Sequence, residues 1–161
     1  MSDDLRDRFL FDLISQRQSQ EWQRVHDLDT KASNTIGFVS IIVGFLLGVR
    51  SLGVGSMLTL WELITFSIGI ASLIIALVYA LLAFRVRKWQ LVPNVKTVIE
   101  EYTSKPLSES IQRIGGEMSK VILELEKGNN TKAVYVQSAW IFTLFGIFMV
   151  FIYTIVSTLT G

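Results

Sequence analysis

The sequence has 161 residues, half of them hydrophobic, with a formal net charge of +1 and no cysteine. The lack of cysteine excludes disulfide bonds and thiol chemistry. The small net charge does not argue for or against a nucleic-acid partner, and we expect none. A mean hydropathy of +0.46 is high for a soluble domain, so the distribution of the hydrophobic residues decides the class of protein.

Residues 1–32 are predicted to form a cytoplasmic helix, because apolar residues recur there every three or four positions. The residues that form its apolar face are Leu5, Phe9, Leu13, Trp22, Val25, Leu28 and Ala32. Neither Gly nor Pro occurs in 1–36. We therefore expect the helix to continue into the apolar segment that follows, with residues 15–20 as either a bend or a solvated section.

Three stretches lack charged residues altogether, namely 32–49, 63–84 and 133–161. A helix needs about 20 apolar residues to cross a bilayer. We therefore predict an all-α membrane protein, and the three transmembrane helices are expected over 33–52, 60–84 and 134–159. The alternative, a soluble protein with large buried helices, leaves too little polar sequence to cover them.

Lys and Arg residues are distributed unevenly between the segments that flank the predicted spans. Residues 1–31 contain five, the segment between the second and third spans contains nine, and the loop between the first two spans contains only Arg50. Cytoplasmic segments of membrane proteins carry the excess of these residues. We therefore predict a protein of the cell membrane with a cytoplasmic N-terminus and an external C-terminus.

The segment 85–132 is predicted to be a cytoplasmic helical insert. Pro93 and Asn94 favour a helix start, so a short helix is expected over 95–103, before a second proline. A seam of apolar residues at spacings of three and four follows. Its members are Leu107, Ile111, Ile114, Met118, Val121 and Leu125. The seam packs either against the N-terminal helix of the same chain or between subunits. Gly-Asn-Asn at 128–130 is expected to form a break or a hinge before the third span.

A compact charge cluster lies where the first predicted span begins. His26 and Asp29 share one helix face, and Asp27 and Lys31 share another. One His and one Asp do not complete a metal site, so a site would need several chains, and we expect no metal or other cofactor. The other interpretation is a salt-bridged helix face at the lipid headgroups. Asp29 is then expected to reach Lys132 or Tyr135 at the start of the third span. The structural or gating candidates are therefore Asp27, Asp29, Lys31, Lys132 and Tyr135.

Chemistry-bearing motifs are missing from the sequence. It contains no nucleophile motif, phosphate-binding glycine loop or nucleotide fingerprint. The predicted spans carry ionisable residues only at their ends, whereas proton relays and coupled transporters usually keep such residues inside the membrane. We therefore expect neither an enzyme nor a pump.

Small residues repeat along one stripe of each predicted span, a pattern that lets helix backbones approach closely. The stripes are Ser40, Gly44 and Gly48 in the first span, Ser72, Ala76 and Ala80 in the second, and Ala139, Thr143 and Gly146 in the third. Each stripe packs either the helices of one chain or several chains. Because a three-helix bundle has little contact area inside the membrane, we expect a homo-oligomer, with these residues as packing or pore candidates.

Asp29-x-Lys31-Ala32 before the first span resembles a motif of the Pycsar transmembrane effector (pycTM-like) family, and the layout is similar to that of the related SLATT domains. An insert that begins near Pro93 and a Lys-aromatic approach to the third span, 132–140, agree with this resemblance. The resemblance implies a self-assembling protein that opens a pore or disrupts the membrane in nucleotide-signalled antiphage defence. It also suggests that Asp29 and Lys31 lock the first span to the insert.

Members of that family often carry a cyclic-nucleotide-binding domain. None is recognisable in this sequence, so we expect a soluble partner protein to sense the signal. Two further functions stay open from the residues alone: a small, constitutive ion channel, and a non-conducting anchor in the lipid bilayer that recruits a soluble partner through the apolar seam.

Overall fold

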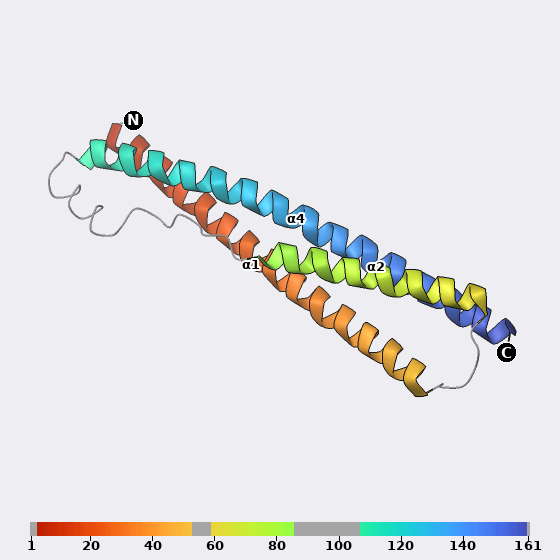
Figure 1. Cartoon of the computed structure of the whole chain (residues 1–161). Coiled ribbons are helices and arrows are strands. Elements are labelled where there is room, and N and C mark those ends of the chain that lie inside the picture. The colour runs from red at the N-terminus through yellow and green to blue at the C-terminus, as the bar shows by residue number, and fades with distance from the viewer. Residues whose placement is uncertain (1–2, 53–58, 86–106, 161) are drawn as a thin grey trace. The chain divides into compact units, whose positions relative to one another are not determined.

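The computed structural model describes residues 3–52, 59–85 and 107–160, and the elements in these ranges are three long helices (Figure 1). They are α1 (Asp3–Leu52), α2 (Leu60–Phe84) and α4 (Leu107–Thr160). Each contains a stretch long and apolar enough to cross a membrane. The predicted helix at 95–103, with its start at Pro93 and Asn94, lies outside the described residues.

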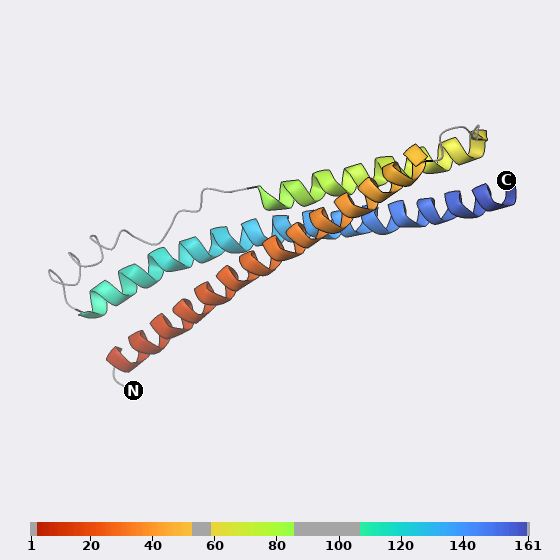
Figure 2. The ribbon, with the colours of Figure 1, turned by 90° about the horizontal axis from the view of Figure 1, so that it is seen from below.

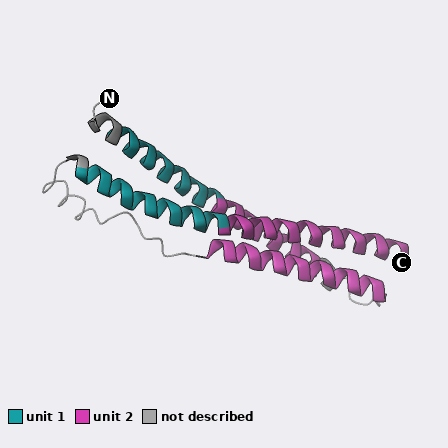
Figure 3. Ribbon diagram, turned by 90° about the horizontal axis from the view of Figure 1, so that it is seen from above, with its two compact units in different colours: residues 1–27, 86–130 teal, residues 28–85, 131–161 magenta. Residues whose placement is uncertain are grey.

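The chain divides into two compact units (Figure 3). Unit 1 comprises Met1–Asp27 and Val86–Asn130, and unit 2 comprises Leu28–Arg85 and Thr131–Gly161. Helices α1 and α4 each contribute to both units, whereas α2 belongs to unit 2 alone. The predicted continuation of the N-terminal helix into the first span is confirmed, because α1 is helical from Asp3 to Leu52.

Unit 1 is a pair formed by α1 and α4. The apolar seam of α4 is buried at Ile111, Ile114, Met118 and Leu125. The position of a Cβ added to Gly115 would lie 3.4 Å from Cδ1 of Ile14, so the two helices are in contact there. Of the two interpretations of the seam, the structure thus has packing against the N-terminal helix of the same chain.

Unit 2 packs α1, α2 and α4 around small side chains. In both ribbon views α2 and α4 lie side by side (Figure 1 and Figure 2). They approach so closely that a Cβ added to Gly146 would lie 2.8 Å from the Cγ of Leu73. Helix α1 joins them through two clusters of buried residues. The members of these clusters are Leu28, Ala32, Ala83 and Val136, and Val39, Leu73 and Ala76.

Helix α2 begins at a capping box that the sequence analysis overlooked. The Thr59 hydroxyl accepts a hydrogen bond from the backbone N–H of Glu62, and the Glu62 carboxylate accepts one from the backbone N–H of Thr59 at 2.7 Å. Together these bonds satisfy two backbone donors that a helix start otherwise leaves free. The Thr-x-x-Glu spacing is visible in the sequence and marks this helix start.

The predicted break at 128–130 is wrong, since α4 is helical through Gly128, Asn129 and Asn130. The prediction rested on the low helix propensity of Gly and Asn. That local preference is overridden because side-chain amide groups of both asparagines bond to residues of α1. Gly115 and Gly116 likewise lie within the continuous helix.

Candidate functional site

Two polar layers link α1 and α4, one in each unit. The layer in unit 2 is an ion pair between Lys132 and Asp29, with 2.6 Å between Nζ and Oδ1. The Lys132 side chain is 7% exposed and that of Asp29 is 34% exposed. A short, charge-assisted bond of this kind is stronger than a bond between neutral groups. Of the two partners considered for Asp29, the structure selects Lys132.

Tyr135, the other candidate for Asp29, packs elsewhere. It lies against the apolar cluster that contains Val136. Its ring centroid is 6.3 Å from that of Tyr79, which in turn stacks on Phe142 at 5.6 Å. The aromatic side chain therefore contributes to packing between α2 and α4 in unit 2.

The expected pair of Asp27 and Lys31 is not formed. Both residues are exposed, and within the described ranges the structure records no ion pair between them. The buried face of α1 instead passes through Leu28, Ala32 and Thr35. An exposed pair at this spacing gains only about 0.3–0.5 kcal/mol, which has to offset the ordering of two long side chains. Lys31 therefore does not join the contact that Asp29 makes with α4.

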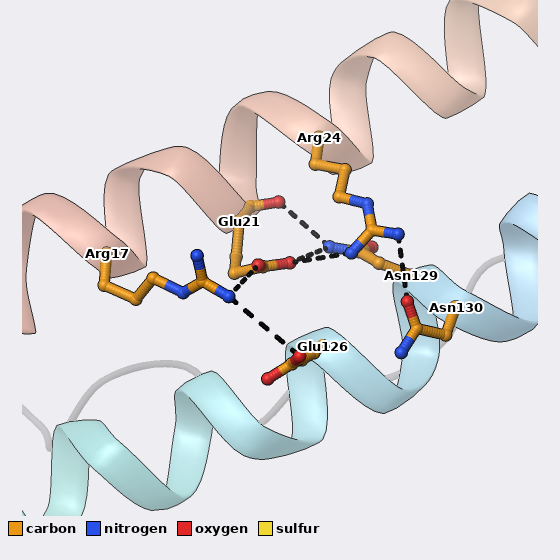
Figure 4. A network of polar contacts seen from close by, with 6 residues as sticks. All are labelled: Arg17, Glu21, Arg24, Glu126, Asn129 and Asn130. Atoms are coloured by element: carbon orange, nitrogen blue, oxygen red, sulfur yellow. Dashed lines mark hydrogen bonds and ion pairs between the residues drawn. The ribbon is translucent and has the colours of Figure 1, made fainter.

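The polar layer of unit 1 is a larger network centred on Glu21 and Asn129 (Figure 4). The Asn129 amide group donates to the backbone carbonyl of Glu21 at 3.0 Å and to its Oε2 atom at 2.9 Å. The Glu21 carboxylate lies 3.4 Å from Arg17 and 3.8 Å from Arg24. Arg24 also donates to Oδ1 of Asn130 at 2.9 Å, and Arg17 lies 3.9 Å from Glu126, so each of the six residues drawn contacts the other helix.

The centre of this network, formed by Glu21 and Asn129, is buried between the two helices. Glu21 is 3% exposed and Asn129 is fully buried. The Oδ1 atom of Asn129 is buried without a hydrogen-bond partner. Buried polar groups usually find partners, because an unsatisfied one costs about 1–3 kcal/mol. Polar residues in such seams commonly set the register of the two helices and lower their stability in return.

The sequence analysis missed Glu21 and Asn129, although a signal for both was present. Continuing the spacing of three and four along α4 beyond Leu125 leads to a further row of buried residues. These are Asn129, Lys132, Val136, Ala139, Thr143 and Gly146. On α1 the same spacing connects buried Gln18, Glu21, Val25, Leu28, Ala32, Thr35 and Val39. Both polar layers therefore occupy positions of these two seams.

The stripes of small residues divide into two classes. Those of α2 and α4 are buried between these helices. Ser72 donates to the Phe142 carbonyl at 2.9 Å, and Thr143 to the Ala139 carbonyl at 2.8 Å. Gly69, which the sequence analysis did not single out, belongs to this contact, because a Cβ there would lie 3.4 Å from the Gly146 carbonyl oxygen.

The stripe of α1 has a different environment. Ser40, Gly44 and Gly48 are all exposed. Among the described residues, a Cβ added at Gly44 or Gly48 would meet no atom of another helix within 4 Å, and the same holds for Gly37, seven residues before Gly44. Seven residues are almost two helical turns, so Gly37 lies on the same face. We call this face, formed by Gly37, Ser40, Gly44 and Gly48, the glycine face of α1.

Comparison with known protein families matches residues 16–160 to the Pycsar effector protein domain, PycTM. No curated protein and no solved structure matches the chain. The match covers most of α1, all of α2 and α4, and both polar layers. The chain therefore belongs to the PycTM family of Pycsar effector domains, membrane effectors of antiphage defence that act by disrupting membranes and not by catalysis.

Proposed function

We propose that copies of this protein assemble in the membrane through the glycine face of α1, and that the assembly opens a pore or disrupts the bilayer. The observation that carries the proposal is the open space around Gly44, where an added Cβ would meet no atom within 4 Å. In membranes, small residues at such spacing let two helix backbones approach and gain van der Waals contact.

The interior of unit 2 supports assembly over conduction by a single chain. Its buried hydroxyl groups, those of Thr35, Ser72 and Thr143, all donate to backbone carbonyl groups of the chain. They are therefore occupied, and α2 and α4 pack closely at Gly146, where an added Cβ would lie 2.8 Å from Cγ of Leu73. A polar path through the membrane has to be built from exposed residues, and Ser40 beside Gly44 offers an exposed hydroxyl group for it.

Dye-loaded liposomes test this function directly. The purified chain is reconstituted at a series of protein-to-lipid ratios, and dye release is recorded together with the particle size in detergent. Gly44→Leu adds bulk to the glycine face and is expected to reduce both assembly and dye release at equal incorporation. Ala71→Leu is the matched control, because Ala71 is an exposed small residue on α2.

The outcomes separate the candidate functions. Equal release by the wild type and Gly44→Leu would show that the glycine face takes no part. Dye release that needs no threshold protein-to-lipid ratio, together with unitary currents in planar bilayers, would favour a constitutive channel. A folded, incorporated wild type that releases no dye at any ratio would favour a non-conducting anchor.

A further inference from the structure

Residues 128–130 of α4 are helical although all three have a low helix propensity. Gly128, Asn129 and Asn130 each favour helix ends or breaks over helix interiors. The structure nevertheless has α4 helical from Leu107 to Thr160. Another interaction must therefore compensate for the low local propensity at these three positions.

The compensating contacts all come from α1 (Figure 4). Asn129 donates twice to Glu21, to the backbone carbonyl and to the carboxylate, across 108 positions of sequence. Asn130 accepts from Arg24. These contacts favour the helical form of this segment over the break that its local sequence prefers.

The same contacts are the weak point of the α1–α4 pair. The Asn129 Oδ1 atom has no hydrogen-bond partner while it is buried, and it would gain water if the helices separated. The buried Glu21 carboxylate would likewise be hydrated. Apolar residues at these seam positions would hold the pair together more firmly than this polar layer does.

We propose that residues 128–130 are a latent hinge that contact with Glu21 and Arg24 holds in helical form. When α1 and α4 separate in unit 1, the hinge is released and α4 breaks directly before its apolar stretch. The device converts a loss of contact between two helices into a change of backbone conformation in α4. It does not depend on how the protein acts on the membrane, so its test needs no activity measurement.

Two pairs of spin labels in the full chain report separately on the hinge and on the clamp, by which we mean the contacts of Asn129 and Asn130 with Glu21 and Arg24. The sequence has no cysteine, so only the introduced cysteines are labelled. Labels at Lys120→Cys and Gln137→Cys, both exposed, lie 17 residues apart on α4. An unbroken helix places them about 25 Å apart, with a narrow distribution. Labels at Gln16→Cys and Lys120→Cys report the distance between α1 and α4.

Asn129→Asp is the variant expected to open the clamp. It removes the amide donor and places a carboxylate against the carboxylate and carbonyl of Glu21. Both distance distributions should then broaden, whereas both stay narrow in the wild type. Adding Glu21→Gln restores a donor facing an acceptor and should make both distributions narrow again. Gln112→Glu is the matched control, because it makes the same chemical change at an exposed position of α4.

Each contrary result overturns the proposal. A broad α4 distribution in the wild type would mean that the hinge is not clamped. If α1 separates from α4 while the distance distribution within α4 stays narrow, residues 128–130 are an ordinary helix segment. Unchanged distances in Asn129→Asp would mean that the polar layer holds neither helix. Circular dichroism of each variant shows that the remaining helices are formed.

Discussion

Replacing Asp29 by Ala should destabilise the protein through the lysine that it leaves behind. The Asp29 carboxylate lies 2.6 Å from the Lys132 ammonium group. Without it, the Lys132 side chain, which is only 7% exposed, keeps its positive charge with no other ion-pair partner among the described residues. The expected loss therefore comes mainly from stranding the charge of Lys132.

The exposure of the two partners sets the magnitude. An exposed ion pair contributes about 0.2–1 kcal/mol. Removing one partner of a fully buried pair costs about 3–5 kcal/mol. Lys132 is nearly buried but Asp29 is 34% exposed, so the pair lies between these limits. We expect Asp29→Ala to lower the free energy of unfolding by about 2 kcal/mol.

The two partners should respond unequally. Lys132→Met keeps the apolar stem of the side chain and leaves only Asp29 without its partner. Because the Asp29 side chain is partly exposed, water can solvate its carboxylate. It should therefore cost less than Asp29→Ala. The double variant, with no charge left at either position, should be more stable than Asp29→Ala alone, because replacing an ion pair by apolar groups is often close to neutral.

Reversible unfolding in mixed micelles, followed by circular dichroism as the SDS fraction rises, measures all three variants. Asp27→Ala and Lys31→Ala are the matched controls, since both residues are exposed members of the same charge cluster. Additive effects in the double variant, or an Asp29→Ala no less stable than Asp27→Ala, would refute the reasoning that Asp29 neutralises a buried lysine.

Two further predictions concern packing and orientation. Gly146→Ala should lower the free energy of unfolding in the same assay by about 1–3 kcal/mol, because its Cβ would lie 2.8 Å from atoms of the fully buried Leu73, whereas Gly44→Ala, which meets nothing within 4 Å, should not. Equal effects of the two would contradict the tight α2–α4 contact. A membrane-impermeant maleimide added to intact cells should label Leu159→Cys and spare Ser15→Cys, both exposed positions, if the Lys and Arg distribution sets a cytoplasmic N-terminus. The reverse labelling would show that this distribution does not set the orientation.

Local sequence patterns predicted the three long apolar helices and one residue contact. The lengths of the charge-free stretches predicted three spans, and the structure has a helix with the predicted bounds at Leu60–Phe84. Whether a segment favours the membrane over water depends on the apolar composition of that segment, so it can be predicted from the sequence without a tertiary structure. The pairing of Asp29 with the start of the third span was also predicted, because a charge at the edge of an apolar segment needs a partner nearby.

Only the tertiary structure decided which local backbone preferences prevail and which small residues are packed against another helix. Residues 128–130 favour a break, but hydrogen bonds from Glu21, 108 positions away from Asn129, outweigh that preference. Gly146 and Gly44 look alike in sequence, yet a Cβ added to Gly146 would collide with Leu73, whereas one added to Gly44 would meet no atom of another helix within 4 Å among the described residues. The environment of a residue is set by whichever helix packs on it, and helix pairing depends on contacts between residues that are distant in the sequence.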